Sequence, residues 1–389
     1  MNNSKSTLTL GAFALFFLSF LMSGNGNALP QVFFQHYYPE QKTLLLSIAL
    51  LSSTIAAVIG IQLSRRVHAR RIAVAISILL TAAITEALLS VSTATQFITC
   101  LVLVQFADNF LLNRIDHAAV ARAGELRGFN DGAGTAARLL GMLSAPAFFT
   151  VFADNSLVKM SVIAVLGIAA MAGCLRLFRL QPLSESKKQP SAELTVPTPI
   201  DWLVFAYAIA VYAALYLFAA NMIYLLKDLL HIPGAETRGG VAIVTVFFSA
   251  LVTNGAVAMT TRSSRQTRLR AVALALPALA LIAAAGLILG GIQADYSLCL
   301  AACVAIGVSY GIFLWEMRDY STSAAKQGKT VLLSWFNNMA NISSLLAFGL
   351  MLALASGNPD AYYLWLMSAI VTVLASGLVA LCFAAALKP

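Results

Sequence analysis

The sequence predicts an all-α integral membrane protein with twelve transmembrane helices in two six-helix halves. Of its 389 residues, 60% are hydrophobic and only 11% are charged, whereas about a quarter of a typical soluble domain is charged. Apolar runs of the ~20 residues that one hydrocarbon span requires fill nearly the whole chain. We expect every span to be a helix, because an open strand edge would leave unpaired backbone groups in lipid.

The expected spans follow one another with short gaps. In chain order they are Leu8–Phe34, Thr43–Leu63, Ile72–Val91, Thr95–Asn113, Phe129–Phe152, Val158–Leu177, Asp201–Leu226, Gly239–Thr260, Ala271–Ile292, Tyr296–Trp315, Thr330–Ala355 and Ala361–Ala386. The longest polar stretch, residues 181–199, is rich in Pro, Ser, Lys and Glu, which is typical of a linker. It predicts an N-terminal half at residues 1–180 and a C-terminal half at residues 200–389.

The net charge of +9 is distributed as membrane topology requires. The basic residues in one alternate set of loops are Arg65, Arg66, Arg70, Arg71, Arg122, Arg127, Arg176, Arg179, Lys187, Lys188, Arg262, Arg265, Arg268, Arg270, Lys326, Lys329 and Lys388. The opposite loops hold only Lys42, Lys159, Lys227 and Arg238. The positive-inside rule therefore predicts cytoplasmic termini in a cell inner (cytoplasmic) membrane. The basic residues form no aromatic-interleaved patch, so no nucleic-acid partner is expected.

The first thirty residues permit a second interpretation. Lys5, an apolar core and small residues near Ala28 could form a cleaved secretory signal. We expect a retained span instead, because apolar character resumes after Pro30. Cleavage would also leave an odd number of spans and place the amino terminus outside.

The two halves show weak internal similarity. Residues 110–116 read FLLNRID and residues 313–319 read FLWEMRD, each at the cytoplasmic end of a span. Gly60 and Gly255 each precede a cluster of arginines. Parallel repeats of this kind build one large group of secondary transporters, whose substrate site lies at the midplane between the halves.

Three segments carry family-like motifs. Residues 27–30 read NALP, which is similar to the ending of a first-helix motif. That motif has an acidic residue seven positions before its Ala, where this chain has Leu21. Gly60, Arg65, Arg70 and Arg71 form a loop motif in which Ser64 replaces the acid. A third segment runs from Arg127–Gly128 to the sequence GMLSAP at residues 141–146, with Ala145 in place of a Gly.

These motifs resemble those of the major facilitator superfamily, and the drug and metabolite efflux branch is the most similar. The resemblance implies a gating role for Gly60, Arg65, Arg70, Arg71, Gly141 and Pro146. It further implies a monomeric secondary transporter that exports a small amphipathic or anionic solute by alternating access, driven by proton exchange. A proton-coupled importer and a non-transporting membrane sensor remain alternatives, since the acids at Leu21 and Ser64 are missing.

Charged residues inside expected spans are functional candidates, because a charge in hydrocarbon is costly. Asp108 lies ~20 Å deep and Arg138 ~14 Å deep at 1.5 Å per residue, so an ion pair between them is expected within a core ~30 Å thick. Arg138 would bind an anionic substrate group and Asp108 would exchange a proton; a static pair that joins two helices is the alternative. Glu86 is a second proton-coupling candidate or a carboxylate near the rim. Glu316 is expected in a surface charge network.

Uncharged polar residues on the expected spans suggest further substrate contacts. Aromatic and amide groups suit an amphipathic solute, although each of them can also join helices. The candidates are Asn25 and Gln31 in the first span, Tyr212, Tyr216 and Asn221 in the seventh, and Asn337 and Asn341 in the eleventh.

Other chemistry has little support. The five cysteines all lie in apolar spans, and the four histidines lack metal-ligand spacing. Residues 327–330 echo the end of a phosphate-binding loop, but Ser323 stands where that loop has its first Gly. We therefore expect no enzyme activity, no metal and no cofactor. The expected partners are a small-molecule substrate, the lipid bilayer and an ion gradient.

Overall fold

The structure is a computed structural model of the whole chain. It describes residues 13–21, 29–66, 71–120, 133–152, 155–179, 197–260, 267–289, 296–326, 338–357 and 361–387. All regular secondary structure in these ranges is helical. The chain divides into two compact units, Met1–Glu185 and Ser186–Pro389, and most of the expected linker lies outside the described residues.

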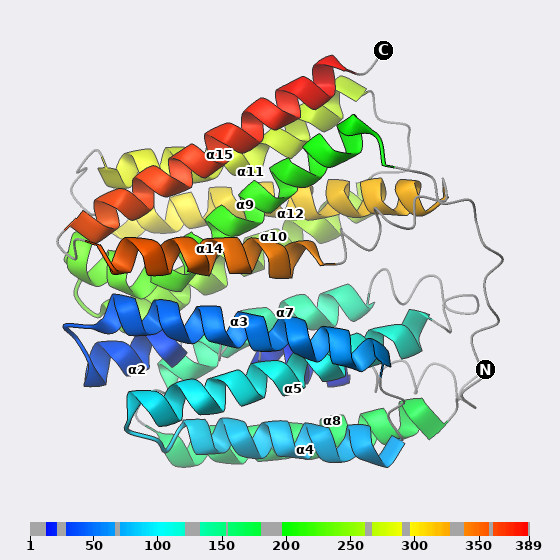
Figure 1. Cartoon of the computed structure of the whole chain (residues 1–389), viewed down its shortest axis with the longest axis vertical. Coiled ribbons are helices and arrows are strands. Elements are labelled where there is room, and N and C mark those ends of the chain that lie inside the picture. The colour runs from blue at the N-terminus through cyan, green and yellow to red at the C-terminus, as the bar shows by residue number, and fades with distance from the viewer. Residues whose placement is uncertain are drawn as a thin grey trace. The chain divides into compact units, whose positions relative to one another are not determined.

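The N-terminal unit contains a helix at residues 13–21 and six labelled helices. These are α2 (Leu29–Tyr37), α3 (Lys42–Arg66), α4 (Arg71–Leu88), α5 (Ala94–Val120), α7 (Ala133–Val151) and α8 (Ser156–Arg179). Helix α5 packs against α3 and α4, and α4 packs against α8 (Figure 1). The core of this unit includes Phe17, Leu18, Ile78, Phe149 and Ile163.

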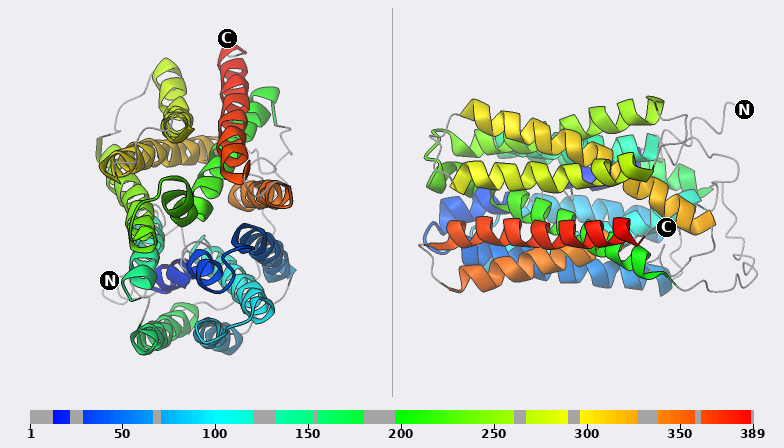
Figure 2. Two further views of the ribbon diagram at one scale, coloured as in Figure 1. Left: turned by 90° about the vertical axis from the view of Figure 1, so that its left-hand side faces the viewer. Right: turned by 90° about the horizontal axis from the view of Figure 1, so that it is seen from above.

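The C-terminal unit contains seven described helical segments. These are α9 (Pro199–Tyr224), the π-helical turn η2 (Leu225–Leu229), α10 (Ala235–Thr260), α11 (Thr267–Leu289), α12 (Tyr296–Lys326), α14 (Met339–Ala355) and α15 (Tyr362–Ala386). Helix α9 packs against α14 and α15, α10 packs against α12, and α11 contacts both α12 and α15. The turned views in Figure 2 show these helices as bundled rods.

Each expected span coincides with a helix in the part of the chain that the structure describes. Six of these helices are long and apolar enough to span a membrane, and four shorter apolar helices accompany them. The span expected at Leu8–Phe34 coincides with two described pieces, residues 13–21 and α2. Helix α12 runs to Lys326 rather than to the expected Trp315, because backbone hydrogen bonding continues after the apolar run has ended. The all-α membrane fold is confirmed.

The start of α9 is fixed by local sequence. Thr198 is the N-cap: the Asp201 backbone donates to its hydroxyl, and the Asp201 carboxylate accepts from the Thr198 backbone. This reciprocal capping box satisfies backbone groups that the first turn leaves unpaired. Pro199 follows at the first helical position, where its missing N–H costs nothing.

Candidate functional site

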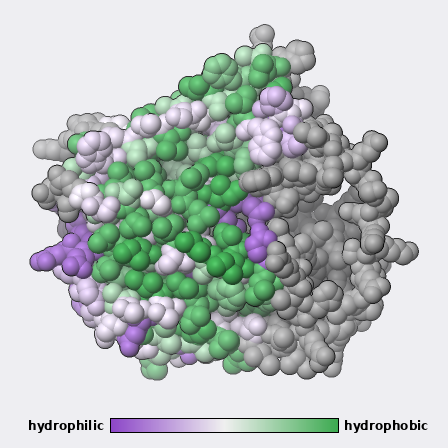
Figure 3. Space-filling model, viewed as in Figure 1, coloured by the Kyte–Doolittle hydropathy of each residue, from purple (hydrophilic) through white to green (hydrophobic). Residues whose placement is uncertain are grey.

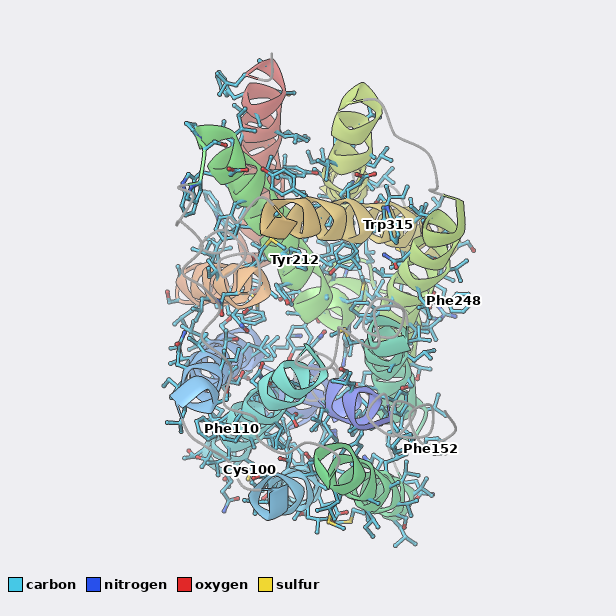
Figure 4. All side chains as sticks on the ribbon, turned by 90° about the vertical axis from the view of Figure 1, so that its right-hand side faces the viewer. Cys100, Phe110, Phe152, Tyr212, Phe248 and Trp315 are labelled. Carbon is cyan, nitrogen blue, oxygen red and sulfur yellow. The ribbon has the colours of Figure 1, made fainter. Side chains whose placement is uncertain are left out.

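Asp108 is the most unusual polar residue of the N-terminal unit. Its side chain is 0% exposed, and neither carboxylate oxygen has a hydrogen-bond partner among the residues that the structure describes. It lies on α5, two residues before Phe110, which is labelled with Cys100 of the same helix in Figure 4. The residues one turn away on the same face, Val104 and Leu111, are also fully buried.

This environment is costly for a charge. An ionised carboxylate loses several kcal/mol of solvation on burial unless hydrogen bonds or an opposite charge compensate. Buried polar groups without partners are rare in folded proteins, so Asp108 is a site candidate on structural grounds as well as by sequence. The expected ion pair with Arg138 is untested, because the structure places the Arg138 backbone on α7 without describing its side chain.

Two glycines of the expected gating motifs bring helices close together. A Cβ on Gly141 of α7 would lie 2.3 Å from the Phe16 carbonyl oxygen and 3.1 Å from the Ser19 Cβ on the helix at residues 13–21. A Cβ on Gly60 of α3 would lie 2.5 Å from the Phe106 carbonyl oxygen on α5. Only a glycine permits either approach, as at other membrane helix contacts.

In the C-terminal unit, two helices also approach each other closely, but at glycines that the sequence did not single out. Gly255, which matched Gly60 by sequence position, has no atom within 4 Å of a Cβ. Instead, Gly307 and Gly311 of α12 approach the Val246 and Ala250 carbonyl oxygens of α10, with Cβ distances of 2.3 and 2.5 Å. The sequence comparison missed these two glycines. Their spacing of four residues was the available signal.

An aromatic cluster lies within the C-terminal unit. Tyr212 and Tyr216 of α9 have ring centroids 6.4 Å apart, and Tyr212 lies 5.8 Å from Tyr310 of α12. Phe313 lies 5.7 Å from Tyr212, and Phe348 of α14 lies 6.0 Å from Tyr216. Tyr212 is labelled in Figure 4. These separations are typical of interacting aromatic rings.

The tyrosines of this cluster keep polar groups in an apolar part of the fold. Tyr212 and Tyr216 are partly exposed, and Tyr310 is buried. The Tyr216 hydroxyl makes no hydrogen bond to a residue that the structure describes. Tyr310 and Phe348 were not among the predicted site residues, although Tyr310 and Phe313 share one helix face by their i, i+3 spacing. The cluster offers ring faces together with hydroxyl groups.

Asn221 joins three helices of the C-terminal unit. Its amide nitrogen donates to the Leu217 carbonyl at 2.9 Å and contacts the Met351 Sδ at 3.4 Å. The Tyr362 hydroxyl donates to its Oδ1 at 2.9 Å. Asn221 is 0% exposed, so these contacts satisfy a polar side chain that would otherwise be buried unpaired.

The remaining polar candidates lie in several different places. Gln31 on α2 is fully buried, and Asn341 is partly exposed near the start of α14. Glu86 is partly exposed two residues before the end of α4, and Glu316 is 4% exposed on α12. The burial of Glu316 does not match the expected surface network, because this part of α12 is covered by packed side chains.

Several predicted residues cannot be placed in full. Asn25, Asn337 and Arg70 lie outside the described residues. Arg65, Arg71 and Pro146 have a helical backbone whose side-chain surroundings are not described. Among the described residues, no group of three or more His, Cys, Asp or Glu side chains could hold a metal ion.

Comparison with known proteins places the chain in a family. A family model described as Major Facilitator Superfamily matches residues 11–348. The chain belongs to the Major Facilitator Superfamily. No curated protein matches it. Solved transporter structures share its fold, and the family indicates a transporter rather than an enzyme.

Three solved transporter structures show the extent of this likeness. An auto-inhibited POT family peptide transporter has a TM-score of 0.72 at 11% identity, covering 99% of this chain and 97% of its own. The nucleoside transporter NupG gives 0.65 at 13%, covering 97% and 98%. A bacterial homolog of the human lysosomal transporter Spinster, inward-facing and occupied, gives 0.63 at 15%, covering 98% and 95%. Identities this low show the fold alone.

Proposed function

We propose that this protein is a proton-coupled secondary transporter that exports a small amphipathic or anionic organic solute. It would act as a monomer in the cytoplasmic membrane, with both termini inside, and alternate between inward- and outward-open states. The observation that carries the proposal is the fully buried carboxylate of Asp108, which has no hydrogen-bond partner among the described residues.

Asp108 supports proton coupling because its two protonation states differ greatly in cost. The neutral acid is tolerated in an apolar core, whereas the carboxylate requires water or a positive charge. A rearrangement that opens α5 to water would therefore release the proton, and closure would favour its return. Arg138 on α7 is the proposed partner of the carboxylate or of an anionic substrate group.

The tyrosines of the C-terminal unit support an amphipathic cargo. Tyr212, Tyr216 and Tyr310 present ring faces for an apolar or aromatic group and hydroxyls for a polar one. The similar solved structures include transporters of nucleosides and of peptides by their names, so the shared fold accommodates chemically different solutes. The proposal of an amphipathic solute therefore depends on these tyrosine side chains rather than on the fold.

The proposed direction rests on the antiporter-like segment around Gly141. This glycine allows α7 to contact the helix at residues 13–21 along its backbone. The contact supports the resemblance of residues 141–146 to the span-five motif of exporters. The alternative to export is proton-coupled import of a small organic solute, and the experiment below distinguishes the two directions.

The decisive experiment compares cells with the gene deleted, restored, and restored as the Asp108→Asn variant. Untargeted mass spectrometry would measure metabolites in the cells and in the medium. Export predicts a compound that accumulates inside and disappears from the medium on deletion, with no recovery by Asp108→Asn. The reverse distribution would establish import. Unchanged solute distributions with a folded protein in the membrane would indicate a sensor and refute transport.

A further inference from the structure

The C-terminal unit carries an apolar groove on its surface, and none of the proposed solute contacts is among the residues that line it. The groove has a volume of about 470 Å³ and lies between α14 and α15, with α9 as its floor. Figure 3 shows mostly hydrophobic residues over the face on which these three helices lie in Figure 1. In a membrane-spanning protein such a surface meets lipid.

Small residues form the floor of the groove. Ala206, Ala210 and Ala213 contribute from α9, and Gly377 and Ala380 from α15. A Cβ on Gly377 would lie 2.8 Å from that of Ala210, so α9 and α15 are already in contact there. The hollow exists because these side chains are too short to fill the space beside α14.

The polar residues of the lining are satisfied within their own helix. The Thr372 hydroxyl donates to the Ser368 carbonyl at 2.8 Å, and the Ser376 hydroxyl donates to the Thr372 carbonyl at 2.9 Å. Their hydroxyl protons are therefore not available to an occupant of the groove, and the other lining residues are Ala, Gly, Ile, Leu and Val. A polar solute would lose its hydration here with little hydrogen bonding in return, which favours a hydrocarbon occupant.

The dimensions of the groove distinguish between hydrocarbon occupants. From Ala206 to Leu217 the floor runs ~16 Å along α9 at 1.5 Å per residue, which is about half of a ~30 Å hydrocarbon core. A hollow of about 470 Å³ along this length suits a single extended alkyl chain. A transmembrane helix, ~10–12 Å across with its side chains, would reach into it only with individual side chains.

The depth of the groove in the membrane indicates which leaflet supplies the acyl chain. Trp202, which is 40% exposed, lies one turn before Ala206 near the start of α9, and exposed Trp residues favour the membrane–water interface. The groove therefore begins just inside the interface on the side where α9 begins and ends near the bilayer centre. We propose that it holds one acyl chain of a phospholipid from that leaflet.

The proposal can be tested by photolabelling in vesicles. The full-length protein would be reconstituted into phosphatidylcholine vesicles that contain a phosphatidylcholine with a diazirine at the middle of one acyl chain. After illumination, peptide mass spectrometry would locate the labels. We expect labels concentrated at Ala206–Leu217 and at residues 372–380, above those at the exposed lipid-facing residues Leu364 and Trp365.

A matched pair of variants provides the control. Ala380→Phe fills the groove and should reduce labelling there roughly fivefold or more, because overpacking excludes the chain. Val379→Phe adds the same ring at a neighbouring residue that is 55% exposed and outside the groove, and should leave labelling unchanged. Ser376→Phe replaces Ala380→Phe if the latter does not yield a folded protein.

Two outcomes would overturn the assignment. Labels spread evenly over the exposed apolar residues, or equally affected by both Phe variants, would mean that no acyl chain is held in the groove. A dimer in the wild-type protein that dissociates in Ala380→Phe but not in Val379→Phe would assign the groove to a second copy of the chain.

Discussion

The Tyr362 hydroxyl donates a 2.9 Å hydrogen bond to the Asn221 Oδ1 and thereby connects α15 to α9. Both residues are fully buried, and Asn221 also contacts Met351 of α14. Tyr363, the next residue, donates to an Asp228 carboxylate oxygen in η2. The C-terminal part of α9 is thus bonded to its two neighbours through side chains, in addition to apolar packing.

Tyr362→Phe should destabilise the protein by about 1 kcal/mol, the usual size of a hydrogen bond between membrane helices. The phenyl ring preserves packing but leaves Asn221 Oδ1 unpaired. Thermal unfolding in detergent measures the effect. Tyr37→Phe is the matched control, because Tyr37 is 50% exposed. Equal melting of the two variants would show that the Asn221 bond contributes nothing.

Tyr320→Phe should also destabilise the protein by about 1 kcal/mol, because the Tyr320 hydroxyl donates to the Asp201 carboxylate that caps α9. Burial and the bond to Asp201 raise the pKa of Tyr320 above its usual value. The stabilisation is therefore fully present below the ordinary tyrosine pKa of ~10 and is lost as the pH rises through the folded-state value. Unfolding measured at neutral and alkaline pH tests both statements; a constant difference between wild type and variant at all pH values would contradict them.

Gly141→Ala should destabilise the N-terminal unit by about 1–3 kcal/mol. The new methyl group would meet the Phe16 carbonyl oxygen at 2.3 Å and separate α7 from the helix at residues 13–21. Gly286→Ala on α11 adds the same group where nothing lies within 4 Å, and it should be neutral. The comparison of the two melting temperatures is the measurement, and similar losses would refute the close contact at Gly141.

Asp108→Asn should leave the fold intact while removing proton coupling. The amide has nearly the shape of the neutral carboxyl group that the apolar core tolerates, but it cannot release a proton. Solute movement in vesicles should continue down its own gradient but no longer respond to an imposed pH gradient. Glu40→Gln, at an exposed residue between α2 and α3, serves as the control. Gradient-driven transport by Asp108→Asn would exclude this carboxyl from coupling.

Tyr216→Ala should weaken substrate binding more than it slows turnover. It removes a partly exposed ring that packs against Tyr212 and Phe348, so the half-saturating concentration should rise by roughly tenfold, as expected for the loss of ~1.4 kcal/mol of aromatic contact. Tyr216→Phe retains the ring and should preserve most of the affinity. Transport kinetics of the solute identified above would measure both, and unchanged kinetics in Tyr216→Ala would remove the cluster from the binding site.

The transmembrane helices and the start of α9 follow from local sequence. Each expected span coincides with a described helix, because ~20 consecutive apolar residues have no other stable backbone arrangement in lipid. The start of α9 could also be predicted from the sequence, since Thr198, Pro199 and Asp201 form a capping motif. Asp108 stood out for the same kind of reason, because a single carboxyl group in an apolar run is costly wherever it lies.

Contacts between helices depended on tertiary structure. Gly60 and Gly255 look equivalent in sequence, yet only Gly60 lies against a neighbouring backbone, and Gly307 and Gly311 provide the contact between α10 and α12. Asn221 is a predicted substrate contact by its place in the seventh span, and only the structure shows its hydrogen bonds to Leu217 and from Tyr362. A residue's partners across helices depend on the rotation of each helix about its axis, which a nearly uniformly apolar span does not specify.

The sequence by itself determined the all-α membrane fold and the approximate ends of its helices, and it marked Asp108 as an acid within an apolar span. The tertiary structure decided which helix faces meet, which tyrosines form one cluster, and where α14 and α15 leave a groove over α9. The physical reason is that the preference for lipid is summed along each span separately. Packing between helices is decided instead by the fit of small and large side chains from segments more than a hundred residues apart, such as Asn221 and Tyr362.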